Sequence, residues 1–283
     1  MWRFSGSAWS YEDNVINKLP LEDAIQRIAK LGFEGVEFRI RDPEREFPPT
    51  RRKKISELLS SLNVSLAAIA LTPYGATSPN ESERKRVIEY FERSCEIAVE
   101  LGTKIVGVWP NEIIPRLAPA SENLNLIKCP YWDAWNRFVE TYAKCVEIAE
   151  DYDLILAIEY RRDTIIGNAD AVLRLRDAIK SKHLGALLDI SHALYARDDV
   201  PTVIEMFKDF LVHTHFGDND GYSDQDHPVG RHHNFEPYLR ALKDIGYKGY
   251  IGFDLEPVNL EDPDEWLLES KLYIQKIMQE LLR

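Results

Sequence analysis

Four side chains that can bind a metal stand where apolar, strand-like segments end in the second half of the chain. Their spacing fits one strand-plus-helix unit or slightly more, and they are Glu159, Asp189, His215 and Glu256. If these strands are parallel, their carboxyl ends meet at one face and the four side chains can converge on a single ion. Carboxylates and an imidazole suit a divalent cation such as Mn²⁺, Mg²⁺, Co²⁺ or Zn²⁺. We therefore predict one metal ion and no organic cofactor.

The elements that would position these residues follow a recurring pattern of helix, glycine and strand. Residues 95–109 show it clearly, with an apolar-periodic helix that ends before Gly102 and a strand that follows, and residues 24–38 and 239–256 repeat it around Gly32 and Gly246. We predict eight strands, at about 3–9, 35–40, 64–71, 104–109, 154–160, 185–190, 210–216 and 250–256. We predict helices at about 20–31, 50–62, 81–101, 133–151, 168–180, 199–208, 235–245 and 263–282. Strict alternation and continuously apolar strands predict a single (β/α)8 TIM barrel over residues 1–283.

The composition excludes several classes of protein. The net charge of −12 argues against a nucleic-acid partner, because such affinity comes mainly from Lys and Arg. The basic run at 51–54 opens an amphipathic helix and is interpreted as its solvated face. No run of about 18 apolar residues exists, which argues against a membrane span, and the first residues lack the apolar core of a signal peptide. With three cysteines in no CxxC pattern, we expect a cytoplasmic protein with reduced thiols, and its oligomeric state stays open, a homo-oligomer included.

Histidines gather near the proposed site. Six of the seven follow Asp189, at the ends of the sixth and seventh predicted strands or in the next loop: His192, His213, His215, His227, His232 and His233. His183 lies before the sixth strand, at the opposite end of the barrel, and is predicted to be a surface residue. The connections 110–130 and 217–234 are too long for simple turns, so we interpret each as a lid or substrate wall.

These residues resemble the xylose isomerase-like TIM barrels, which include ketose 3-epimerases, inosose dehydratase, hydroxypyruvate isomerase and endonuclease IV. The resemblance rests on Glu159, Asp189 with His192 three residues later, the pair His213 and His215 followed by Asp218, and Glu256. The run from Asp226-His227 to Gly230, then residues 246–249 and Glu256, is similar to the ending of the group. The resemblance covers nearly the whole chain but does not single out one activity.

The resemblance implies a function and a role for each residue. Glu159, Asp189, His215 and Glu256 match the metal ligands of ketose 3-epimerases, and His192 matches a substrate contact. The two glutamates would be the acid/base pair of a sugar isomerase or epimerase that works through a metal-stabilised enediolate. The alternatives are a structural ion-pair network for the glutamates and a helix cap for Asp189. For His192, the alternative is a hydrogen bond to a loop.

Further candidates surround these positions. We predict that Glu37, Trp109, Arg161 and His227 contact a sugar or sugar phosphate, with plain packing, ion pairs or loop structure as the alternatives. Trp9, like Trp109, could pack against a sugar, with plain packing as the alternative. Arg162, like Arg161, could bind a phosphate or carboxylate, with ion pairs to nearby acids as the alternative. His213 is an extra ligand or a support for His215, and Asp218 is a weaker candidate.

Departures from the family pattern bear on the substrate. Endonuclease IV needs histidines near strands three and four, and here those strands end without any, which argues against its three-metal phosphodiester chemistry. Ketose 3-epimerases carry a substrate-binding Glu and an Arg where this chain has Ile165 and Gly221. Inosose dehydratase, hydroxypyruvate isomerase and a barrel that binds a sugar without catalysis stay open as alternatives.

Overall fold

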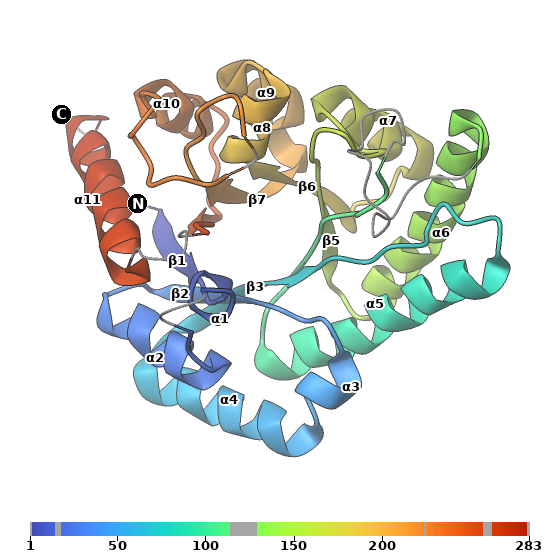
Figure 1. Cartoon of the computed structure of the whole chain (residues 1–283), viewed down its shortest axis with the longest axis horizontal. Helices are drawn as coiled ribbons and strands as arrows, with labels where there is room; N and C mark the ends of the chain where they lie inside the picture. Colours follow the sequence, from blue (N-terminus) through green and yellow to red (C-terminus); the bar gives the residue numbers. More distant parts are fainter. Residues whose placement is uncertain (1, 15–17, 114–128, 224, 257–261, 282–283) are drawn as a thin grey trace.

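Eight parallel strands close into a barrel in the order of the sequence, as predicted. The computed structural model describes residues 2–14, 18–113, 129–223, 225–256 and 262–281, and Figure 1 shows the strands at the centre of a ring of helices. The strands are β1 (Arg3–Ser7), β2 (Gly35–Arg39), β3 (Ser65–Leu71), β4 (Ile105–Val108), β5 (Ile155–Glu159), β6 (Leu184–Asp189), β7 (Leu211–Phe216) and β8 (Tyr250–Phe253). Because every strand is parallel to its neighbours, all their carboxyl ends lie at one face of the barrel.

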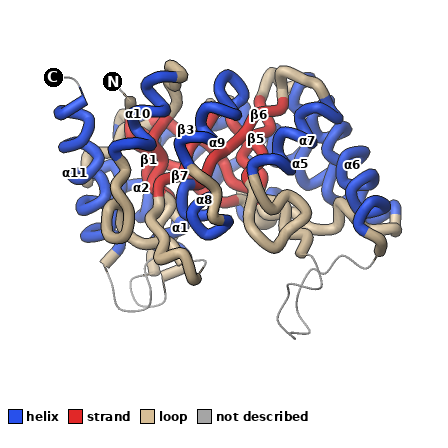
Figure 2. Tube along the Cα trace, turned by 90° about the horizontal axis from the view of Figure 1, so that it is seen from above, coloured by secondary structure: helices blue, strands red, loops and turns tan. Residues whose placement is uncertain are grey.

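The helices pack around the outside of the barrel (Figure 2). The main ones are α2 (Leu21–Lys30), α4 (Pro49–Leu62), α5 (Glu81–Leu101), α6 (Tyr131–Asp151), α7 (Ala169–Ile179), α9 (Val200–Phe207), α10 (Glu236–Asp244) and α11 (Pro263–Leu281). Four short helical segments were not predicted: α1 (Trp9–Glu12), α3 (Pro43–Glu46), α8 (Ile190–Ala196) and the 3-10 turn η2 (Lys208–Phe210). None of the described helices is long and apolar enough to cross a membrane.

Local sequence explains most of these boundaries. The strands are buried on both sides, which matches their continuous apolar runs. Gly32 and Gly102 have φ of 78° and 85°, so each ends its helix in the left-handed conformation that glycine adopts without strain. Two predicted strands are too long. The first ends at Ser7, and Trp9 begins α1; the last ends at Phe253, three residues before Glu256.

The prediction for His183 is wrong. This side chain is 8% exposed, and its Nδ1 lies 2.8 Å from the carbonyl oxygen of Leu154. The sequence places it in the turn before β6, where a polar residue is normally solvated. Instead the imidazole is buried beside Leu154, the residue directly before β5.

A buried glutamate, Glu112, ties together three loops at the mouth of the barrel through its side chain and its backbone. Glu112 follows β4, and its Oε1 accepts hydrogen bonds from the backbone N–H groups of Gly75 and Ala76 in the loop after β3. Its carbonyl oxygen accepts a bond from the N–H of Ile165, after β5. Burial raises the pKa of Glu112 from 4.5 to about 7, and the backbone hydrogen bonds offset only part of this effect.

We expect this carboxyl group to make stability depend on pH. The folded protein holds the Glu112 proton more tightly than the unfolded chain, so its stabilising contribution is complete below pH 4.5 and is lost as the pH rises through about 7. Wild-type protein should therefore lose up to about 3 kcal/mol more stability than Glu112→Gln over this range. Denaturant unfolding at several pH values measures the difference. Glu57→Gln, on the exposed face of α4, is the control, and equal slopes for wild type and Glu112→Gln would refute the prediction.

Candidate metal centre

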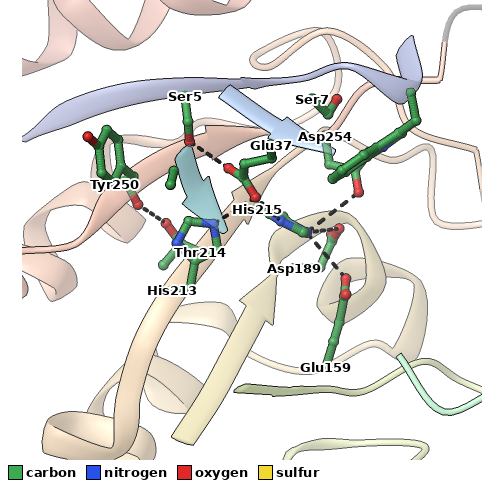
Figure 3. A network of polar contacts seen from close by, with 12 residues as sticks. Ser5, Ser7, Glu37, Glu159, Asp189, His213, Thr214, His215, Tyr250 and Asp254 are labelled. Atoms are coloured by element: carbon green, nitrogen blue, oxygen red, sulfur yellow. Dashed lines mark hydrogen bonds and ion pairs between the residues drawn. The ribbon is translucent and has the colours of Figure 1, made fainter. Parts of the chain in front are cut away.

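Four side chains converge at the carboxyl ends of the last four strands. Glu159 ends β5, Asp189 ends β6, His215 lies near the end of β7, and Asp254 directly follows β8. One potential ligand atom from each lies within 4.8 Å of the others. His215 Nδ1 is 3.5 Å from Glu159 Oε1, 3.5 Å from Asp254 Oδ2 and 3.9 Å from Asp189 Oδ2 (Figure 3). The structure thus brings together three of the four predicted ligands and adds Asp254.

The fourth predicted ligand, Glu256, lies apart from this cluster. Its side chain is 52% exposed, and its Oε1 is 3.6 Å from Arg39 Nη2. The reason is the early end of β8, after which the chain carries residue 256 outward. Asp254 takes the inner place, and its Oδ1 accepts a hydrogen bond of 2.5 Å from Trp9 Nε1. The sequence alone could have indicated Asp254 as a candidate ligand, because residues 254 and 256 share one side of an extended segment.

His215 is oriented by a second buried carboxylate. Its Nε2 lies 3.0 Å from Glu37 Oε2, which leaves Nδ1 facing the cluster (Figure 3). The same oxygen of Glu37 is 3.0 Å from His213 Nε2, and Ser5 Oγ donates to Glu37 Oε1. A Cβ at residue 252 would lie 2.5 Å from Glu37 Oε1, so Gly252 leaves the space that this carboxylate occupies. Partners of this kind fix the ring and tautomer of a ligating histidine.

The positions of Glu37 and His213 in the structure bear on the roles predicted for these two residues. Glu37 is 2% exposed and lies behind His215, so its position favours orienting the ligand over contact with a substrate. His213 is fully buried beside Glu37, which favours support of His215 over the role of an extra ligand. Sequence alone could not find the pairing of Glu37 with the two histidines, because β2 and β7 meet only across the interior of the barrel.

The charges in the cluster call for a compensating cation. Burial raises the pKa of Asp189 to about 7 and that of Asp254 above its ordinary range. Burial also opposes ionisation of Glu159, but the charge and hydrogen bond of His215, with the charges of His192 and Arg39, together outweigh burial and lower that pKa. For His215, burial lowers the pKa, yet Glu37 and Glu159 together raise it well above its ordinary value. Three carboxyl groups therefore crowd around the one imidazole of His215.

A divalent cation fits these residues. Among the described residues, Asp189 Oδ2 and His215 Nδ1 are buried without a hydrogen-bond partner, and both face the cluster. Buried polar atoms are seldom left without partners, and those that are often mark an ion site. Asp189 also accepts a hydrogen bond from the N–H of His192 through Oδ1 and so caps α8. The helix-cap alternative and the ligand position therefore coexist, one on each carboxylate oxygen.

A pocket of about 130 Å³ opens above the cluster, and we call it the metal pocket. His192 lines it, with its Nε2 3.8 Å from Glu159 Oε1. Trp109 and Arg161 also line it, and the Arg161 guanidinium lies over the indole of Trp109 at 4.9 Å. These three predicted substrate contacts thus border the same space as the cluster. Arg162 instead lies over the ring of Tyr195.

Besides Asp254, sequence reasoning missed two charged residues that line the metal pocket. Arg39, at the end of β2, donates to Asp13 and lies near Glu256. Asp226 is 5% exposed, and burial raises its pKa well above the ordinary value. Asp226 belongs to the motif on which the family resemblance rests, but the substrate contact predicted from that motif was its neighbour His227.

His227 and Asp218 lie in the long loop after β7. His227 does not line the metal pocket, and its ring packs 4.9 Å from His232 and 6.2 Å from Trp266. The Asp218 carboxylate accepts bonds from the N–H groups of His232 and His233. The structure therefore favours a loop-building role for both residues. The loop itself reaches the metal pocket through Asp226, whereas 114–128 of the other predicted wall lie outside the described residues.

Comparison with known proteins places this geometry in context. Residues 25–277 match the family described as xylose isomerase-like TIM barrel. MJ1311 of Methanocaldococcus jannaschii, an uncharacterised protein, is 30% identical over 253 residues, which cover 86% of this chain and 80% of that protein. Fructoselysine 3-epimerase of Escherichia coli O157:H7 is 23% identical over 260 residues, covering 87% and 89%. A crystal structure of a D-tagatose 3-epimerase-like protein shares the fold, with a TM-score of 0.79, 24% identity and 99% coverage of both chains.

Proposed function

Because the chain belongs to the family of xylose isomerase-like TIM barrels, we propose that it is a divalent-metal-dependent epimerase or isomerase of a ketose or sugar phosphate. The observation that carries the proposal is the cluster of Glu159, Asp189, His215 and Asp254, in which two buried ligand atoms lack hydrogen-bond partners. One relative is named a fructoselysine 3-epimerase, so we propose carbon 3 of a ketose as the reacting carbon.

The residues present could hold the metal through oxygen and imidazole ligands. Glu159, Asp189 and His215 would bind it, with Asp254 as the fourth ligand in place of Glu256. This set of hard ligands suits Mn²⁺, Mg²⁺ or Co²⁺ better than a metal that prefers sulfur. When bound, such an ion supplies Lewis-acid stabilisation of the charge that develops on adjacent carbonyl and hydroxyl oxygens of a sugar.

The protein groups around the pocket supply the proton transfers. Glu159 is the proposed base, because His215, His192 and Arg39 together outweigh the effect of burial and keep its pKa below the ordinary value, so the side chain is ionised and can take a proton. Glu256 lines the same pocket and is the proposed acid that returns a proton to the other face of the sugar. His192, Trp109 and Arg161 are the proposed substrate contacts, and the indole would pack against the C–H face of a sugar.

A deuterium screen tests this function. The protein is incubated in D₂O with Mn²⁺, Mg²⁺ or Co²⁺ and a panel of ketoses, ketose phosphates, hydroxypyruvate and inososes. Proton and deuterium NMR then locate the label. We expect deuterium at carbon 3 of a ketose together with the carbon-3 epimer. Exchange confined to hydroxypyruvate or an inosose would replace the proposal with one of the two alternative activities, and cleavage of abasic DNA would contradict it outright.

A further inference from the structure

A second, larger cavity adjoins the metal pocket. It has a volume of about 720 Å³, against about 130 Å³ for the metal pocket, and we call it the side pocket. Its walls are the loops after β2 and β3 and one face of α5, so it opens at the same face of the barrel as the metal centre. Thr72 lines both cavities. A molecule whose reacting carbons lie over the cluster can therefore extend into the side pocket.

The boundary between the two cavities is built from charged residues. Asp13 accepts a hydrogen bond of 3.0 Å from Arg39, which lines the metal pocket. It also accepts two bonds from Arg41, which lines the side pocket, at 2.7 and 2.9 Å. The two arginines stand two residues apart at the end of β2 and are held by one carboxylate. The walls of both cavities therefore keep a fixed relation to one another.

The side pocket presents charges of both signs. Arg41 and Arg86 contribute two guanidinium groups, and Asp42 and Glu83 contribute two carboxylates. Arg86 Nη2 is 3.9 Å from Glu83 Oε1, and the side chains are 71% and 44% exposed, so each can turn to a ligand at little cost. A ligand group with only one charge would face like charge on part of the wall. A group with both charges would find a partner for each.

Aromatic rings complete the lining of the side pocket. Tyr74 is 65% exposed, unusual for so large a side chain, and it stands on the loop after β3. Tyr90 is fixed by donation from its hydroxyl to the carbonyl oxygen of Ile40. Glu112 holds the backbone of Gly75 from behind, so the wall beside Tyr74 is anchored. The side pocket therefore combines aromatic walls with charged groups of both signs.

We propose that the side pocket binds the second part of a ketose conjugate, a substituent with both an ammonium and a carboxylate group, such as an amino acid joined to the sugar. This inference rests on the proposed function, because the sugar part must lie over the metal centre. It makes the natural substrate a conjugate and not a free sugar. Arg86 would face the carboxylate of the substituent, and Glu83 or Asp42 would face its ammonium group.

Four probes that differ in the group at carbon 1 test the proposal. They are fructose, fructose that carries glycine at carbon 1 through its nitrogen, fructose 1-phosphate and 1-O-methylfructose. We expect kcat/KM for deuterium incorporation to be at least about tenfold higher for the glycine conjugate than for the other three, as charge-assisted hydrogen bonds would give. Equal values for fructose and the conjugate, or a preference for the phosphate, would overturn the side pocket as the substituent site.

Two arginine variants on the same helix sharpen the test. Arg86 pairs with Glu83 and Arg93 pairs with Glu96, both three residues apart on α5, but only Arg86 lines the side pocket. Arg86→Gln should lower the preference for the conjugate over fructose about tenfold, and Arg93→Gln should leave it unchanged. Equal effects of the two variants would overturn the assignment.

Calorimetry separates this proposal from the proposed function. Titration of the metal-loaded protein with the glycine conjugate measures binding whether or not turnover occurs. Tighter binding than fructose without any exchange would keep the side pocket and refute the epimerase proposal. Exchange without tighter binding of the conjugate would keep the epimerase proposal and refute the side pocket.

Discussion

Glu159→Gln is expected to lower deuterium incorporation at carbon 3 more than about 1000-fold. The amide keeps the shape of the side chain but has neither the charge that binds a cation nor the basicity that takes a proton. In the structure Glu159 Oε1 lies 3.8 Å from His192 Nε2 and 3.5 Å from His215 Nδ1, and its lowered pKa keeps the carboxylate ionised. No other described residue of the cluster combines these properties.

The metal content of this variant separates the two roles of Glu159. If the protein keeps its Mn²⁺ and loses exchange, the side chain acts mainly as the base. If it loses both, binding of the ion dominates. Glu205→Gln, on the exposed side of α9, controls for the loss of one negative charge. Full exchange activity in Glu159→Gln would show that the proposed base is wrong.

Asp254→Asn and Glu256→Gln are expected to have opposite effects on the metal and on the product. Asp254 faces His215 at 3.5 Å, so its loss as a carboxylate should weaken Mn²⁺ binding by about 10- to 100-fold or more. The asparagine can still accept the hydrogen bond from Trp9, which limits damage to the fold. Glu256→Gln should keep the ion, because that side chain is outside the cluster.

The second variant should instead change which product forms. With Glu159 intact, deuterium still enters carbon 3 from one face of the sugar. Without the acid on the opposite face, we expect formation of the epimer to fall about 100-fold or more. Manganese titration and NMR of the products measure both quantities. If Glu256→Gln loses the ion and Asp254→Asn keeps it, then the ligand predicted from sequence is correct and the cluster seen here does not describe the loaded site.

The sequence predicted the barrel well because the strands and helices carry strong local patterns. Runs such as 154–158 are apolar throughout, and glycines such as Gly102 mark helix ends, so the order of elements followed from near neighbours alone. The ends of strands were harder. Ser7 and Phe253 end their strands where pairing with the neighbouring strand stops, and no local signal marks that point.

A site residue could be predicted from the sequence where its position depended only on its own strand. Glu159, Asp189 and His215 were found because each ends an apolar run, and they do converge. Residues whose position depends on distant segments were not. Glu37 reaches His213 and His215 from the far side of the barrel, and Trp9 reaches Asp254 across 245 positions in the sequence. Asp254 itself was not predicted, because the family pattern assigns the fourth ligand to Glu256.

The most direct test of the metal-dependent mechanism compares one protein sample with and without its ion. Chelator-treated protein and the same protein reloaded with Mn²⁺ are incubated in D₂O with the ketose that the screen identifies, and NMR follows carbon 3. The cluster of Glu159, Asp189 and His215 predicts one deuterium at that carbon, and the epimer, in the reloaded sample alone. Equal exchange in both samples would contradict the account, because it would show that proton transfer proceeds without the ion.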